Sequence, residues 1–212
     1  QSPTWVVMGQ LTAEAPLSPA TVAPAAPFAD ALEAVGLERT LTYGRLPGGL
    51  VMLNWPLGGN DWHHGLGRSI APLALDRDAL NQEMQEHSLQ FLEQLSRCSD
   101  GWLTCGEAFP SSSPHLALMP YWREGRRMIG QSVVSELDLL PVTKQARRSH
   151  LPATSIAVGT YANDHHYPGD DWPLAPKSCR WGGRWTGTPF CIPFEALVSV
   201  EVSNLLAAEK CF

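Results

Sequence analysis

The sequence has 212 residues, of which 44% are hydrophobic and 17% are charged, and its formal net charge is -6. This composition is typical of a globular protein and excludes a disordered chain. The negative charge argues against a nucleic-acid-binding protein, which needs a basic surface, and no apolar run approaches the roughly 20 residues that a membrane-spanning helix requires.

The first third of the chain predicts two strands and a helix. The run WVVMGQL (residues 5–11) predicts a strand, and the proline-rich residues 12–27 predict a loop. FADALEAVGLE has its apolar residues at helical spacing, and Gly36 is expected to stop this helix. GGLVMLNWP predicts a second strand, which Pro56 ends.

Residues 76–98 give the clearest pattern, an amphipathic helix that covers a core. Asp76 or Asp78 lies near its N-terminus, where a negative charge favours the helix dipole. Polar residues fill the remaining faces. The predicted core stripe consists of Leu80, Met84, Phe91, Leu92 and Leu95.

The segment LALMPYWREGRRMIGQSVVSE predicts a strand, a tight turn at Glu124–Gly125 and a second strand over residues 127–134. Ser135 and Asp138 have the spacing of a cap for a short helix, ELDLLPVTKQARR, which Pro141 limits.

The last third predicts another strand at residues 154–162, followed by a stretch rich in Gly, Pro, Trp and charge. PFEALVS and SNLLAAEKC return to regular structure, and the sequence ends inside what is expected to be a buried strand. Strands and helices do not alternate regularly, so we predict an α+β fold with a mixed, mainly antiparallel sheet and two or three covering helices.

Three polar clusters are candidates for chemistry. Arginine presents a fixed fork of donors to anions, histidine moves protons near neutral pH, and aromatic side chains wall small-molecule pockets. Each residue taken alone is more often structural than functional, so the convergence of the clusters carries the prediction. The first cluster has Asn54, Asn60, Asp61, His63 and His64; the second has Arg123, Glu124, Arg126 and Arg127; the third has Asp164, His165, His166, Tyr167, Lys177, Arg180 and Arg184.

Several alternatives find less support. Adjacent histidines point in different directions on a strand or turn, so at most one of each pair is expected to face a given cavity. A metal site has suitable ligand types but no HExxH, HxH or CxxC spacing. The five scattered cysteines are expected to be reduced and mostly buried. There is no phosphate-binding GxxxxGK[ST] or GxGxxG motif and no GxSxG elbow.

Four segments resemble the FAD-dependent oxidoreductase family of bacterial flavoproteins: LPGGLVMLNWPLGGND, YWREGRRMIG, the stretch from SIAVGTYANDHHYPGDDW to CRWGGRWTGTPFCIPFEAL, and VSNLLAAEKCF. The resemblance covers roughly residues 40–212 in the family's order. The family's glycine-rich strand–turn–helix, which holds the FAD pyrophosphate, has no counterpart here, and neither has its helix after the NLLAAEK strand. The REG tripeptide also stands where the family more often has Ser or Thr before the Arg pair.

This resemblance implies a fragment: a substrate-side domain over residues 1–200 and the first strand of a truncated FAD domain over residues 201–212. FAD would serve the full-length family, with none bound to this chain and no metal. The substrate would be small and anionic or polyhydroxylated. The implied catalytic residues are His64, His166, Arg123, Arg180 and Arg184, and the implied substrate-binding residues are Asn54, Asn60, Asp61, Trp62, Glu124 and Tyr167.

By the same resemblance, one of His64 or His166 would move a proton. An arginine would hold the substrate or stabilise reduced flavin, which carries the redox chemistry. The alternative is a stand-alone carbohydrate-binding module that uses Trp55, Trp62, Trp181 and Trp185. We expect no nucleic-acid or membrane partner, a homo-oligomer through the truncated edge, and favour a cytoplasmic location.

Overall fold

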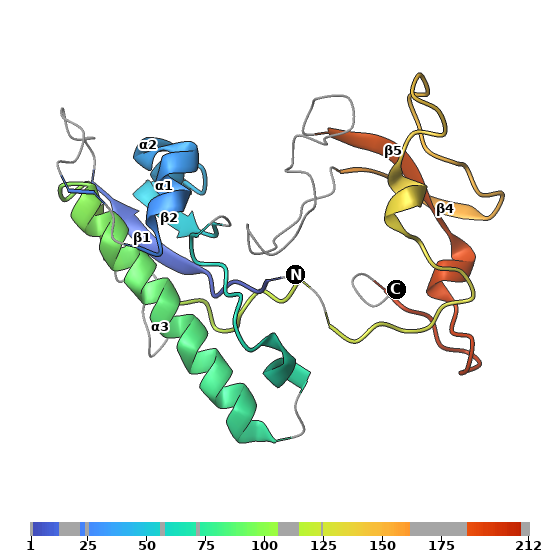
Figure 1. The fold of residues 1–212 in the computed structure, drawn as a ribbon, viewed down its shortest axis with the longest axis horizontal. Coiled ribbons are helices and arrows are strands. Elements are labelled where there is room, and N and C mark those ends of the chain that lie inside the picture. Colours follow the sequence, from blue (N-terminus) through green and yellow to red (C-terminus); the bar gives the residue numbers. More distant parts are fainter. Residues whose placement is uncertain are drawn as a thin grey trace. The chain divides into compact units, whose positions relative to one another are not determined.

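The computed structural model contains three α-helices and five β-strands in two antiparallel sheets within the part of the chain that it describes (Figure 1). The predicted α+β class is confirmed. No helix of this part is both long and apolar enough to cross a membrane. The described residues are 2–12, 22–23, 26–55, 58–70, 73–105, 115–123, 125–161 and 186–208.

Contacts divide the chain into two compact units, which are described separately below. Unit 1 comprises residues 1–123 and 166–172, and unit 2 comprises residues 124–165 and 173–212. The predicted functional division near residue 200 stays a prediction.

Unit 1 is built on a three-stranded antiparallel sheet. The central strand β1 (Val7–Leu11) pairs with β2 (Leu50–Leu53) on one side and with β3 (Leu103–Thr104) on the other. A short 3-10 turn, η1 (Pro47–Gly49), precedes β2. The strands predicted at residues 5–11 and before Pro56 are therefore confirmed.

The long helix α3 (Ala74–Cys98) runs alongside β1 (Figure 1). All five residues of the predicted core stripe are buried, which confirms that stripe. The helix approaches the sheet closely at Gly9, where an added Cβ would lie 2.6 Å from Leu103 Cδ1 and 3.2 Å from Leu92 Cδ1. The absence of a side chain at this position lets α3 pack against the strand.

Helices α1 (Ala29–Val35) and α2 (Leu37–Thr42) complete the cover of unit 1. The predicted helix ends as expected at Gly36, whose positive φ of 80° suits a residue without a side chain. The Phe28 ring packs on the Phe91 ring of α3, with centroids 5.2 Å apart. A further 3-10 helix, η2 (Leu66–Ile70), precedes α3.

The strand predicted between Leu116 and the turn at Glu124–Gly125 does not form, so that prediction was wrong. This segment follows the N-terminal chain through two isolated bridges, Val7 to Leu116 and Thr4 to Tyr121. Pro120 lies between them and has no N–H to donate, so a continuous ladder cannot extend across it.

Unit 2 contains a two-stranded antiparallel sheet of β4 (Ser155–Tyr161) and β5 (Thr186–Pro193). The strand predicted at 154–162 is confirmed. The short helices η3 (Glu136–Leu139) and η5 (Phe194–Leu197) flank the sheet. The predicted capping pair is also present, since Ser135 and Asp138 form a capping box. However, the helix is a single 3-10 turn that ends before Pro141.

Two further strand predictions in unit 2 were wrong. Residues 127–134 form a single bridge, Gly130 to Ser199, because the 3-10 turn of η5 interrupts the chain beside them. The described residues 203–208 form a turn and a bridge from Leu206 to Val198 instead of a buried strand. Leu206 is 58% exposed.

Candidate functional site

A buried ion pair lies at the centre of the polar cluster in unit 1. Nη1 of Arg123 is 3.4 Å from Oδ1 of Asp61, and the two side chains are 9% and 0% exposed. Burying a charge is costly unless a partner and hydrogen bonds compensate it. Asp61 and Arg123 are each other's partner. Asp61 lies in the loop after β2, and Arg123 is the last residue of the first segment of unit 1.

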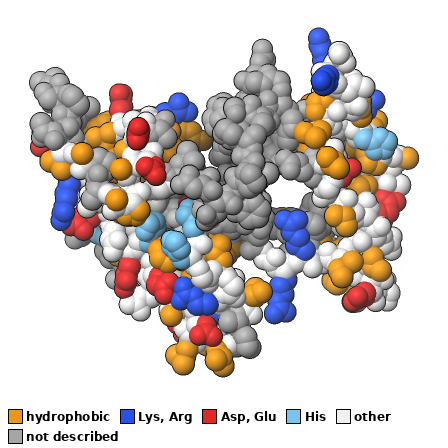
Figure 2. Space-filling view, viewed as in Figure 1, with side chains coloured by type: hydrophobic (Ala, Val, Ile, Leu, Met, Phe, Trp, Pro, Cys, Tyr) orange, Lys and Arg blue, Asp and Glu red, His pale blue; other side chains and the backbone are white. Residues whose placement is uncertain are grey.

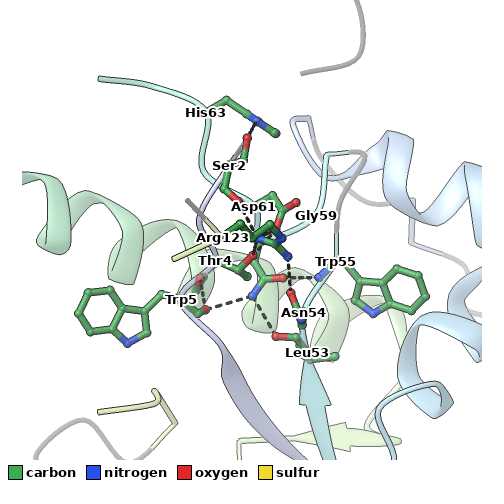
Figure 3. Close-up of polar contacts among 12 residues, drawn as sticks. Ser2, Thr4, Trp5, Leu53, Asn54, Trp55, Gly59, Asp61, His63 and Arg123 are labelled. Carbon is green, nitrogen blue, oxygen red and sulfur yellow. Dashed lines mark hydrogen bonds and ion pairs between the residues drawn. The ribbon is translucent and has the colours of Figure 1, made fainter. Parts of the chain in front are cut away.

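The N-terminal segment completes the pair (Figure 3). The Thr4 hydroxyl donates a hydrogen bond to the Asp61 carboxylate and accepts one from Nη1 of Arg123 at 2.7 Å. Nη1 of Arg123 also donates to the carbonyl oxygen of Ser2 at 2.6 Å, and Nη2 donates to Oδ1 of Asn54 at 3.2 Å. The guanidinium therefore joins three separate segments of the chain. We call Ser2, Thr4, Asn54, Asp61 and Arg123 the Arg123 network.

Asn60 fixes the loop that carries Asp61. Its Oδ1 accepts a hydrogen bond from the Trp55 backbone N–H at 2.8 Å, and its Nδ2 donates to the carbonyl oxygens of Trp5 (3.1 Å) and Leu53 (3.0 Å). The side chain is 1% exposed. Asn60 thus provides hydrogen-bond partners for backbone groups at the end of β2, and buried polar groups need such partners.

The two adjacent histidines of this loop lie in different surroundings, as predicted for such a pair. His63 is hydrogen-bonded through Nδ1 to the Ser2 hydroxyl. His64 is exposed and lies edge-on to the Trp62 ring, with centroids 5.4 Å apart. Trp62 Nε1 also donates to the His64 carbonyl oxygen at 2.7 Å. His64 is therefore the more accessible imidazole of the two.

His87 of α3 supports the same loop, a role that was not predicted from the sequence. Its ring lies against Phe28 (5.1 Å) and Trp62 (5.2 Å), and its Nε2 is 3.0 Å from the carbonyl oxygen of Gly59. Burial lowers the pKa of His87, so the neutral imidazole is favoured. The sequence did contain a signal for this burial, because His87 follows Met84 of the core stripe by three residues and so lies on the same side of the helix.

The structure brings together only part of the predicted site. The first cluster and Arg123 of the second cluster meet in unit 1, while Arg126 and Arg127 are exposed in unit 2. The remaining predicted site residues, Glu124, His166, Tyr167, Arg180 and Arg184, lie outside the described residues, as do Asp164, His165, Lys177, Trp181 and Trp185.

No buried side-chain nitrogen or oxygen of the Arg123 network lacks a hydrogen-bond partner. Among the described residues, the one buried side-chain nitrogen or oxygen atom without a hydrogen-bond partner is Nδ1 of His115, which is not part of the network. Trp55 is also internal: it is 9% exposed, and its Nε1 donates to the Thr40 carbonyl oxygen at 3.0 Å. This burial removes Trp55 from the predicted sugar-binding surface.

A family model described as FAD dependent oxidoreductase matches residues 9–212. The chain belongs to this family. The resemblance found in the sequence is thereby confirmed, and the match also extends to β1 and α1, which lie outside the resembling segments. No curated protein and no solved structure matches the chain.

The described α-helices of this FAD-dependent oxidoreductase family member offer an FAD pyrophosphate no N-terminus free of negative charge. Such a group binds best at a helix N-terminus that lacks negative charge. Each α-helix of unit 1 instead carries an acidic residue in its first turn, namely Asp30 in α1, Glu38 in α2 and Asp76 in α3. The buried guanidinium of Arg123 is already paired with Asp61.

A metal centre finds no support in the described part of the chain, where no group of three or more His, Cys, Asp or Glu side chains has suitable placement. Three cysteines lie there as free thiols. Cys98 is buried, which raises the pKa of its thiol, and Cys191 is half-buried. Cys105 is exposed, contrary to the expectation of mostly buried cysteines.

Proposed function

We propose that this chain forms the substrate-side part of an FAD-dependent oxidoreductase. The family match over residues 9–212 carries this proposal. The sequence contains no glycine-rich pyrophosphate motif, so the nucleotide would be held by protein outside these 212 residues. The flavin would supply the redox chemistry, and this chain would bind and orient a small anionic or polyhydroxylated substrate.

Within this proposal, His64 takes up or delivers a proton at its imidazole. Its exposure and its contact with Trp62 support this role, since a proton carrier must reach the substrate from a fixed position. Arg123 acts as a positioning residue. Its donors are engaged by Ser2, Thr4 and Asn54 within the chain, so it orders the loop and is not available as an open anion site.

Asn54, Asn60 and Asp61, which were predicted to bind substrate, would likewise position the loop through their internal hydrogen bonds. Trp62 would wall the space beside His64. Roles for Glu124, His166, Tyr167, Arg180 and Arg184 stay predictions, and so does self-association of the chain.

A binding panel tests the substrate-side role without flavin. The purified chain is titrated with neutral polyols and small carboxylates, and binding is followed by calorimetry. The proposal expects saturable binding of at least one compound from either class. Comparison with His64→Gln separates binding from proton transfer, because this change should leave the dissociation constant unchanged. Absence of binding across both classes would contradict the substrate-side role.

A further inference from the structure

Unit 2 contains a hollow that no part of the predicted site includes. Its volume is about 340 Å³, which lies within the range of small-molecule sites. Its walls come from residues 131–134, η3, the segment leading into β4, and the end of β5 with the start of η5. Three separate stretches of chain, residues 131–138, 150–154 and 191–195, thus converge on one concave surface.

Two carboxylates face this hollow, and each has one oxygen held by a hydroxyl group. Oδ2 of Asp138 accepts hydrogen bonds from the backbone N–H and the hydroxyl of Ser135, both at 2.8 Å. Oε2 of Glu195 accepts one from the Thr154 hydroxyl at 2.5 Å. These bonds fix the orientation of both carboxyl groups.

The same hydrogen bonds keep both groups ionised. The Ser135 backbone and side chain lower the pKa of Asp138, and the Thr154 hydroxyl lowers the pKa of Glu195. A carboxylate can only accept hydrogen bonds, so the hollow presents fixed, charged acceptors at neutral pH.

The rest of the lining supplies complementary chemistry. Ser132, Gln131 and His150 add groups that can donate or accept, while Val134, Pro152 and Pro193 add apolar surface. Among the described residues, no Lys or Arg side chain lines the hollow. An anionic ligand would meet two carboxylates without a compensating Lys or Arg from these residues, whereas a hydroxyl-rich ligand could donate to both.

We propose that this hollow binds a small, neutral polyhydroxylated molecule of about monosaccharide size through Asp138 and Glu195. This inference rests on the proposed function, from which it takes the polyhydroxylated class of ligand, and it concerns the hollow of unit 2 alone. Binding itself needs no flavin, so it can be tested on the chain alone.

Cys191 provides a local reporter, because its thiol lines the hollow. The experiment measures the alkylation rate of each cysteine by mass spectrometry, with myo-inositol, D-glucose or glycerol present. Cys105, which is exposed in unit 1, serves as the internal control. Cyclohexanol serves as the ligand control, because it has the ring of inositol with a single hydroxyl group.

At least one polyol should slow alkylation of Cys191 and leave Cys105 unchanged, and cyclohexanol should have no effect. D-Glucuronate should protect less well than D-glucose, because its carboxylate is repelled. The proposal is overturned if no polyol protects Cys191, if Cys105 slows equally, or if D-glucuronate protects better than D-glucose.

Variants assign the binding energy to the carboxylates. Glu195→Gln removes the charge and keeps the shape, and it should raise the dissociation constant about tenfold, or about 1.4 kcal/mol, since a hydrogen bond to a charged acceptor is stronger than one to a neutral amide. Glu201→Gln is the matched control, because Glu201 belongs to unit 2 but does not line the hollow. Equal polyol binding by both variants would overturn the proposal that the hollow binds polyols, and it would leave the proposed function unaffected. The proposed function fails separately if the chain holds FAD by itself.

Discussion

At the scale of single residues, the pair of Asp61 and Arg123 decides how the loop after β2 is held. Asp61→Asn keeps an acceptor for Thr4 but leaves a guanidinium that is 9% exposed without its counter-charge. Loss of one partner of a buried pair costs about 3–5 kcal/mol. We therefore expect the free energy of unfolding of unit 1 to fall by about that amount in urea titrations followed by tryptophan fluorescence.

Two controls accompany this variant. The double variant Asp61→Asn with Arg123→Met should recover part of the loss, because the unpaired charge is removed. Glu83→Gln breaks the pair with Arg68, whose side chains are 40% and 32% exposed, and should change stability far less, since water screens such pairs. Equal effects of Asp61→Asn and Glu83→Gln would show that the Arg123 network does not hold the loop.

His87 gives the loop a dependence on pH. Its pKa in the folded state lies below the ordinary value of 6.5, because burial disfavours the charged imidazole. The unfolded chain therefore binds the proton more readily, and stability is lost as the pH falls below about 6.5. Wild type should lose more stability between pH 7.5 and pH 5 than His87→Gln, as measured by urea midpoints. An identical loss in both proteins would contradict this role.

The sequence indicated part of this site and missed another part for a physical reason. The composition of residues 54–64 marked Asn60, Asp61 and His64 as unusual. Ser2 and Thr4 carried no signal, because their contacts with Arg123 span about 120 residues of chain and local patterns do not encode such distances. The same limit explains why the sequence did not indicate that Arg123 pairs with Asp61.

At the scale of elements, α3 carries the core of unit 1. Leu92 is 1% exposed and lies under Gly9 of β1, whereas Leu89 of the same helix is 37% exposed. Leu92→Ala should cost about 2–5 kcal/mol through lost burial and the cavity left behind. Leu89→Ala should have a much smaller effect. Denaturant titrations of the two variants test this, and equal losses would mean that this face of α3 does not form the core.

Elements with a local signature could be predicted, and elements that depend on a partner could not. Three predicted features depend only on residues close together in the sequence, and all three are present. They are the core stripe of α3, the end of α1 at Gly36, and the capping box of Ser135 and Asp138. The strand expected at residues 127–134 needed a neighbouring strand, and η5 interrupts the chain that lies beside it.

At the scale of the whole molecule, the two units differ in what stabilises them. Every residue of the buried hydrophobic cluster found in the described chain lies in unit 1. Unit 2 has a sheet of two strands, and hydrophobic side chains are visible at the surface of the molecule in Figure 2. In unit 2, Ile156 and Val158 of β4 are 53% and 70% exposed. Two strands without a core are marginally stable in water.

Hydrogen exchange followed by mass spectrometry should resolve this difference. Backbone amides of β4 and β5 should exchange faster than those of β1 and α3, because local opening costs less where few apolar groups are buried. Saturating polyol should slow exchange in β4 and β5 if ligand binding orders the hollow. Equal protection of the two units without ligand would contradict this division of stability.

The central proposal is that this family member supplies the substrate side of a flavoenzyme and does not hold the nucleotide itself. Equilibrium dialysis of the purified chain against FAD, read by flavin absorbance, tests it most directly. The account predicts equal FAD concentrations on both sides of the membrane, within error. Retention of one FAD per chain would contradict it.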